Sequence, residues 1–134
     1  MDIKQRGSRW VLIAGILIAL LGLIHIAATP YIYPSFAMQL AAGHEFVFLY
    51  MFIATGIAVI FIGLLIMYCS RGLKTNEPWA RTIALAAGLF MLILGICAVL
   101  AMAGNPFAYL TVVFSIVELL PLWLYRRELR QKGK

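Results

Sequence analysis

The chain has 134 residues, of which 64% are hydrophobic and 12% are charged, and its formal net charge is +6. Soluble domains average about 45–50% apolar and about 25% charged residues, so a soluble fold of this size could not cover its apolar surface. The composition excludes an ordinary soluble protein. It indicates that residues 1–134 form a single membrane domain.

Four apolar stretches are each near or above the roughly 20 residues that cross a bilayer as a helix. They cover residues 10–28, 46–70, 80–103 and 107–125. The first resembles a signal peptide in its basic flank, but it is longer than an ordinary h-region and ends without a good cleavage site. We therefore predict an all-α fold, an integral membrane bundle of four transmembrane helices.

The basic residues predict the orientation of these helices. All 11 Lys and Arg residues lie before the first stretch, between the second and third, or after the fourth, and none lies in 29–45 or 104–106. The positive-inside rule assigns the basic face to the cytoplasm, so both termini are predicted to be cytoplasmic, with 126–134 as a basic tail. The orientation of the helices in the membrane thus explains the positive net charge of the chain. We therefore expect membrane lipids as partners, with a homo-oligomer or a larger membrane complex as alternatives, and no nucleic acid.

Glycines recur seven residues apart in three of the predicted helices. A seven-residue step keeps small residues on one seam, where two helix backbones can approach closely. These residues are therefore predicted to pack helix against helix: Gly15, Gly22, Gly56, Gly63, Gly88 and Gly95.

The connection 29–45 is long, apolar and free of Lys and Arg. Ser35 can cap a short helix that ends near Ala42, before Gly43. We predict an outer loop containing a short interfacial helix. Between the third and fourth stretches, Asn105 and Pro106 predict a tight turn with the proline at the start of the last helix.

Three proton-exchanging side chains are predicted near the outer end of the bundle. His25 lies inside the first stretch on its glycine seam, and His44 and Glu45 lie where the second begins. Ionisable groups inside a membrane are costly and mark candidate functional sites. We predict a cavity between the first two helices lined by His25, Tyr33, His44 and Glu45. Tyr31 and Asn105 are further candidate ligand-binding residues. The alternative is structural: His25 makes an interhelical hydrogen bond, and Glu45 favours a helix N-terminus.

Glu118 is a second costly residue, located within the fourth stretch and followed three positions later by Pro121. A carboxyl beside a helix-breaking proline makes Glu118 a candidate for proton coupling. The alternative is that Glu118 is neutral, or pairs with Arg81, and only fixes the packing.

Cofactor signatures are weak in this sequence. His25 and His44 could supply ligands to a haem or, with Glu45, to a metal ion, but their spacing matches no compact ligand motif, and we expect no metal site. Cys69 and Cys97 lie about half a membrane apart. This is too far for a disulfide, and both are expected to be buried thiols.

The segment GILIALLGLIHIA, followed by three more spans and a basic tail, resembles the DoxX-like group of small bacterial inner-membrane proteins. The resemblance implies a multi-pass protein of the bacterial inner membrane, and it carries over no functional residue.

These observations leave three functions open. The first is a membrane protein that binds an apolar ligand, lipid or quinone-like, at its outer mouth, or that acts as an accessory subunit. The second is a small proton-coupled transporter using Glu118. The third is a membrane enzyme with His25 and Glu45 as an acid–base pair, so the sequence does not decide whether the protein is an enzyme.

Overall fold

The computed structural model describes residues 3–37 and 44–124, and these residues form four helices. Each helix is long and apolar enough to span a membrane. Their bounds are Ile3–Ala37 for α1, Glu45–Lys74 for α2, Pro78–Ala101 for α3 and Pro106–Leu124 for α4. The prediction of an all-α fold with four such helices is confirmed.

Helix α1 is much longer than the predicted 10–28, and two expectations about its C-terminal end were wrong. Residues 29–37 continue the helix instead of opening a loop, and Ser35 lies inside α1 instead of capping a new helix. Pro30 and Pro34 are accommodated within α1. In an apolar segment without charges, helical hydrogen bonds remain the cheapest way to satisfy the backbone. The rest of the predicted interfacial helix, residues 38–42, lies outside the described residues, as does the tail 126–134.

Each of the two described turns depends on an asparagine. After α2, Asn76 adopts a left-handed φ of 61°, and the Glu77 amide donates to the Gly72 carbonyl at 2.8 Å. This is a Schellman-type helix end with asparagine at the left-handed position. Before α4, the Asn105 side chain accepts a hydrogen bond from the Phe107 amide at 3.0 Å, so Asn105 caps α4 and Pro106 occupies its first position, as predicted.

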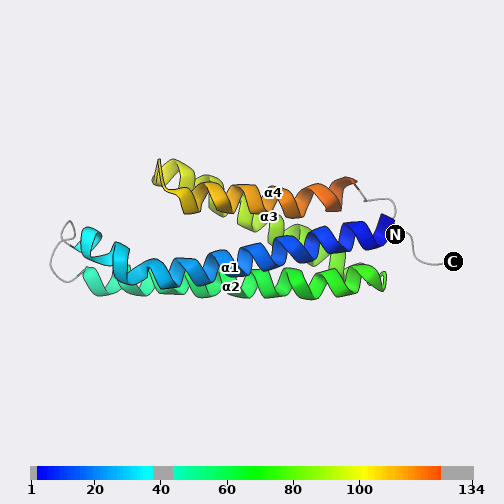
Figure 1. The fold of residues 1–134 in the computed structure, drawn as a ribbon, viewed down its shortest axis with the longest axis horizontal. Coiled ribbons are helices and arrows are strands. Elements are labelled where there is room, and N and C mark those ends of the chain that lie inside the picture. The colour runs from blue at the N-terminus through cyan, green and yellow to red at the C-terminus, as the bar shows by residue number, and fades with distance from the viewer. Residues whose placement is uncertain (1–2, 38–43, 125–134) are drawn as a thin grey trace.

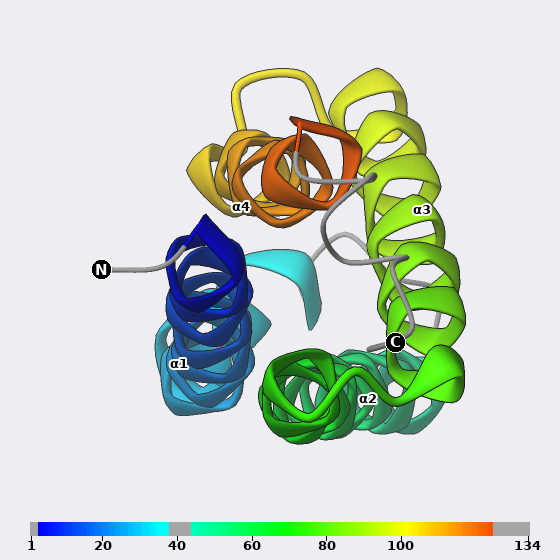
Figure 2. The same ribbon diagram turned by 90° about the vertical axis from the view of Figure 1, so that its right-hand side faces the viewer.

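The helices form an antiparallel square in the order α1, α2, α3, α4, with α4 closing against α1 (Figure 2). Within the described residues, α1 does not pack against α3, and α2 does not pack against α4. The α1–α2 pair is the longest and makes the most extensive contact, and it projects beyond α3 and α4 at one end (Figure 1).

The two ends of the bundle differ in charge. One end holds the start of α1 with Arg6 and Arg9, the end of α2 with Arg71 and Lys74, and the start of α3 with Arg81. We call this the basic end. The opposite end, which we call the distal end, holds residues 44–45 and the α3–α4 turn at 102–105.

Two pairs of glycines join α1 to α2. A Cβ atom placed on Gly22 would lie 2.7 Å from the Ile60 nitrogen and 2.8 Å from the Gly56 oxygen, and one on Gly15 would lie 2.9 Å from the Gly63 oxygen. No side chain larger than hydrogen fits these distances without movement of a backbone. The glycines that recur seven residues apart in α1 and α2 therefore lie on the α1–α2 interface.

Helix α3 contacts α2 and α4 at different heights. Near the basic end, a Cβ on Gly72 would lie 2.6 Å from the Ala80 side chain, so α2 and α3 are close at their turn. Further along, Gly88 and Gly95 face Glu118 and Val112 of α4. Helix α3 thus leans from α2 at the basic end toward α4 at the distal end (Figure 2). Buried apolar side chains, among them Ile18, Ile66 and Met91, fill the space between the helices.

Candidate functional site

His25 is held by aromatic rings near the distal end. Its imidazole stacks on Phe52 of α2, with ring centroids 3.9 Å apart and an interplanar angle of 20°. The Phe107 ring of α4 meets it edge-on at 6.3 Å. Although the residue is only half-buried, its Nε2 atom is buried and has no hydrogen-bond partner. The structure thus presents a ring nitrogen that can exchange hydrogen bonds but has none.

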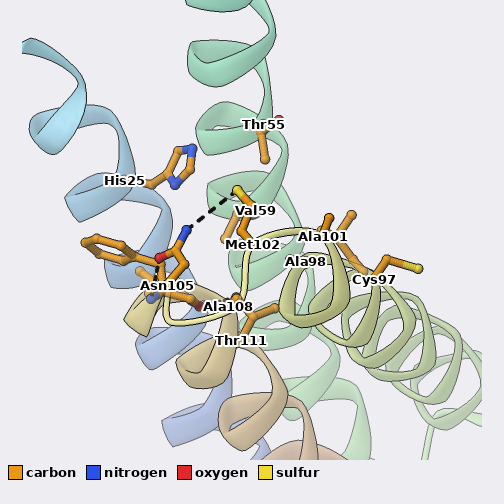
Figure 3. A pocket seen from close by; sticks show the side chains of 13 residues that line it. His25, Thr55, Val59, Cys97, Ala98, Ala101, Met102, Asn105, Ala108 and Thr111 are labelled. Atoms are coloured by element: carbon orange, nitrogen blue, oxygen red, sulfur yellow. Dashed lines mark hydrogen bonds between the residues drawn. The ribbon is translucent and has the colours of Figure 1, made fainter. Parts of the chain in front are cut away.

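A cavity of about 320 Å³ lies beside this imidazole, and all four helices contribute to it (Figure 3). Its walls are mostly apolar. The polar side chains among them are His25, Thr55, Cys97, Asn105 and Thr111. The full lining consists of Leu21, His25, Thr55, Val59, Leu94, Cys97, Ala98, Ala101, Met102, Asn105, Phe107, Ala108 and Thr111.

A second cavity, of about 210 Å³, adjoins the first toward the end of the bundle. The two share His25, Thr55, Met102, Asn105 and Phe107 as walls. His25 and Asn105 therefore stand between two hollows. Volumes of this size, apolar walls and a few polar groups are typical of a small-molecule pocket.

Three of the other polar side chains in the lining already make hydrogen bonds within the protein. Asn105 caps α4 through Oδ1, and its Nδ2 donates weakly to the Met102 sulfur at 3.8 Å. The hydroxyls of Thr55 and Thr111 donate to the Met51 and Phe107 carbonyls, each at 2.8 Å. Of these side chains, His25 is the one with a buried, unpaired nitrogen. Any ligand that needs one directed polar contact would find it there.

The larger cavity opens between α2 and α3. Thr55 on α2, Cys97 and Ala101 on α3, and Met102 directly after α3 are exposed while lining the cavity. This opening follows from the lean of α3 away from α2 toward α4. It also corrects one expectation: Cys69 is buried as predicted, but Cys97 is exposed.

Of the other candidate residues from the sequence, Asn105 lines both cavities with His25, and Tyr31, Tyr33, His44 and Glu45 line neither. His44 and Glu45 are exposed at the start of α2, and neither they nor Tyr33 lines either cavity beside His25. Tyr31 is 84% exposed. Glu45 precedes Phe52 by seven residues, or about 10 Å of helix, and no hydrogen bond joins His25 to Glu45. Tyr33, His44 and Glu45 therefore do not line these two cavities, and α1 continues as a helix to Ala37 instead of opening a loop at residue 29.

The described residues around His25 do not form a set of cofactor ligands. Within residues 3–37 and 44–124, no group of three His, Cys, Asp or Glu side chains could hold a metal ion. His25 lies against Phe52, eight residues or about 12 Å of helix beyond His44. This arrangement does not favour a haem held by both histidines.

Glu118 lies away from this site, in the half of α4 nearer the basic end. It is 0% exposed, and neither carboxyl oxygen has a hydrogen-bond partner. The alternative of a Glu118–Arg81 ion pair is not observed: no salt bridge joins the two, and the Arg81 Nε is itself buried without a partner. Glu118 and His25 therefore belong to two separate regions.

Several lining residues were not identified from the sequence. Phe52 and Phe107 are two aromatic residues among many, and Thr55, Cys97 and Thr111 each look like ordinary small or polar members of an apolar helix. One signal was available: Thr55 directly precedes Gly56 on the α2 seam, so it lies next to the α1 contact. The tilt of α3, which creates the cavity, has no such signal.

Comparisons with known proteins add no assignment to this geometry. Searches against protein-family models, curated proteins and solved structures found no match to the chain.

Proposed function

We propose that the protein is a multi-pass protein of the bacterial inner membrane, with both termini in the cytoplasm. We further propose that it binds a membrane-soluble ligand in the larger cavity beside His25, which we call the distal cavity. The charge difference between the two ends supports this orientation through the positive-inside rule. The distal end then lies toward the outer face of the membrane, and the opening between α2 and α3 faces lipid.

One observation carries the proposal: the buried, unpartnered Nε2 of His25 at the wall of an apolar cavity. A buried polar atom without a hydrogen bond costs about 1–3 kcal/mol. A leucine or phenylalanine at position 25 would avoid this cost and still pack on Phe52. A ligand that forms a hydrogen bond with Nε2 removes this free-energy cost.

The cavity chemistry restricts the class of ligand. Imidazole nitrogen can donate to a carbonyl oxygen or accept from a hydroxyl, while the alanines, Val59 and Leu94 accept apolar atoms. The lateral opening at Thr55 and Cys97 lets an apolar tail extend into the membrane. The ligand is therefore a molecule with one oxygen-bearing head and an apolar body, as found in quinones and in acyl glycerols.

Native mass spectrometry of the full-length protein in detergent tests this proposal. Decylubiquinone serves as the probe for a quinone ligand, and dioleoylglycerol serves as the probe for an acyl glycerol. We expect one of them to bind with a stoichiometry of one. His25→Phe, which keeps an aromatic ring on Phe52 but removes the nitrogen, should weaken that binding at least tenfold, or about 1.4 kcal/mol.

Tyr31→Phe is the matched control, because Tyr31 is exposed and lines neither cavity. It should bind both probes like the wild type. Binding of neither probe, or equal binding by wild type and His25→Phe, would contradict the proposal.

A further inference from the structure

Glu118 is a fully enclosed carboxyl that the distal cavity does not use. It is 0% exposed, and both of its oxygens lack a hydrogen-bond partner. The carboxyl rests on the backbone of Gly88 in α3: a Cβ placed there would lie 2.8 Å from Glu118 Oε2 and 3.0 Å from its Cδ. The carboxyl therefore lies within the contact between α3 and α4.

The charged and titratable groups around Glu118 do not neutralise a negative charge. Helix α3 contributes Arg81, which forms no salt bridge with Glu118 and whose Nε is unpartnered. Helix α2 contributes Cys69, a buried thiol that carries no positive charge. No cation in residues 5–34 and 44–124 forms an ion pair with Glu118.

An ionised carboxylate without a partner is very costly in an apolar interior, because no water or dipole replaces its hydration. A neutral carboxylic acid avoids that cost. A metal ion is disfavoured, because a hard cation needs several oxygen ligands, and no cluster of three His, Cys, Asp or Glu side chains forms among the described residues. The ligand that fits this site is a proton.

We propose that Glu118 is a proton-binding site whose neutral form holds α4 against α3 at Gly88, and that release of the proton opens this contact. The negative charge left behind would lie directly on Gly88, with no partner in the packed state. Separation of α4 from α3 lets water reach it. Pro121, buried one turn further along α4, cannot donate to the Val117 carbonyl, so α4 lacks one backbone hydrogen bond at the place where it would bend.

The proton on Glu118 can be detected with dicyclohexylcarbodiimide on the full-length protein in detergent at neutral pH. The acid gives its proton to one nitrogen of the carbodiimide, and the carboxylate oxygen bonds to the central carbon. The acyl group then migrates to nitrogen, leaving a stable N-acylurea. Nothing is lost, so the protein gains the whole mass of the reagent.

We expect one adduct, mapped to Glu118 by peptide mass spectrometry, in the wild type and none at that position in Glu118→Gln. Glu45→Gln is the control, because Glu45 is an exposed carboxyl, and this variant should label like the wild type. An unlabelled Glu118 in folded wild-type protein overturns the protonated site.

Opening is measured with the two native cysteines as reporters. N-ethylmaleimide adds a thiol across its double bond, with the proton passing to carbon. Cys69 is buried in the core between the helices and Cys97 is exposed, so only Cys69 needs the core to open. In Glu118→Gln, which mimics the neutral acid permanently, we expect Cys69 to react several-fold more slowly than in the wild type, with the Cys97 rate unchanged.

The stability of the variant separates this outcome from misfolding. Glutamine has the shape of the protonated acid, so the Tm of Glu118→Gln should equal or exceed that of the wild type. An unchanged or faster Cys69 reaction in the folded variant overturns the proposed opening. A large fall in Tm would show that Glu118 is charged and paired in the folded state, which also overturns the proposal.

Discussion

The α1–α2 seam gives the sharpest prediction of the fold, because two glycines on it face different atoms. A methyl group on Gly22 meets backbone, with the Ile60 nitrogen at 2.7 Å and the Gly56 oxygen at 2.8 Å. A methyl group on Gly56 first meets the Ile26 side chain at 2.5 Å, and its nearest backbone atom, the Gly22 oxygen, is at 3.2 Å. Gly22→Ala must therefore move a helix, whereas Gly56→Ala needs mainly a side-chain rearrangement.

The expected loss in the free energy of unfolding follows from these distances. Ordinary contact begins at 3.4 Å, so Gly22→Ala forces a separation of about 0.7 Å at a seam that continues through Gly15 and Gly63. Overpacking of this kind costs about 1–3 kcal/mol, and the better helix propensity of alanine returns up to about 1 kcal/mol. We expect a net loss of about 1–2 kcal/mol for Gly22→Ala and a loss smaller by about 1 kcal/mol for Gly56→Ala.

Unfolding in mixed micelles with increasing SDS, followed by far-UV circular dichroism, measures both losses. Ala58→Leu is the control for added volume, because Ala58 is exposed on α2, and its stability should stay within about 0.5 kcal/mol of the wild type. A Gly22→Ala protein as stable as the wild type, or a larger loss for Gly56→Ala than for Gly22→Ala, would refute the close backbone contact.

Three further predictions concern the distal end and the orientation. Ala98→Phe places a ring in the 320 Å³ cavity, so it should abolish probe binding in native mass spectrometry while leaving the Tm at or above that of the wild type. Asn105→Ala removes the cap of α4 and should cost about 1 kcal/mol in the same SDS titration. In a cysteine-free background, Glu45→Cys should react with an impermeant maleimide on intact cells, and Thr75→Cys should react only after lysis. The reverse pattern would contradict the proposed orientation.

The number of helices and the glycine contacts could be predicted because each depends on a local rule. A long uncharged run must become a helix in an apolar solvent, and a seven-residue glycine step must lie on one seam. The predicted end of the first helix at residue 28 was wrong for the same physical reason. Pro30 and Pro34 are turn signals in water, but in a long apolar segment the helix continues past both.

Of the candidate ligand-binding residues named from the sequence, His25 and Asn105 line both cavities. The place of His25 on the α1 seam is a property of one helix, and the place of Asn105 follows from the tight turn before Pro106. The other walls depend on how helices cross. Cys97 and Thr111 line a cavity with His25 because α3 leans toward α4 at Gly88 and Gly95 and leaves α2 at the distal end. No periodicity within a single helix encodes that lean, and it leaves His44 and Glu45 outside the cavities.

The central claim, that a membrane-soluble ligand occupies the distal cavity, is tested most directly by protection of Cys97. This thiol lines the cavity at its opening, and a cysteine introduced as Ala58→Cys provides an exposed thiol on α2 outside it. With saturating decylubiquinone or dioleoylglycerol, whichever binds, we predict slower modification of Cys97 by N-ethylmaleimide and an unchanged rate at position 58. Equal rates at Cys97 with and without the bound probe would contradict the claim.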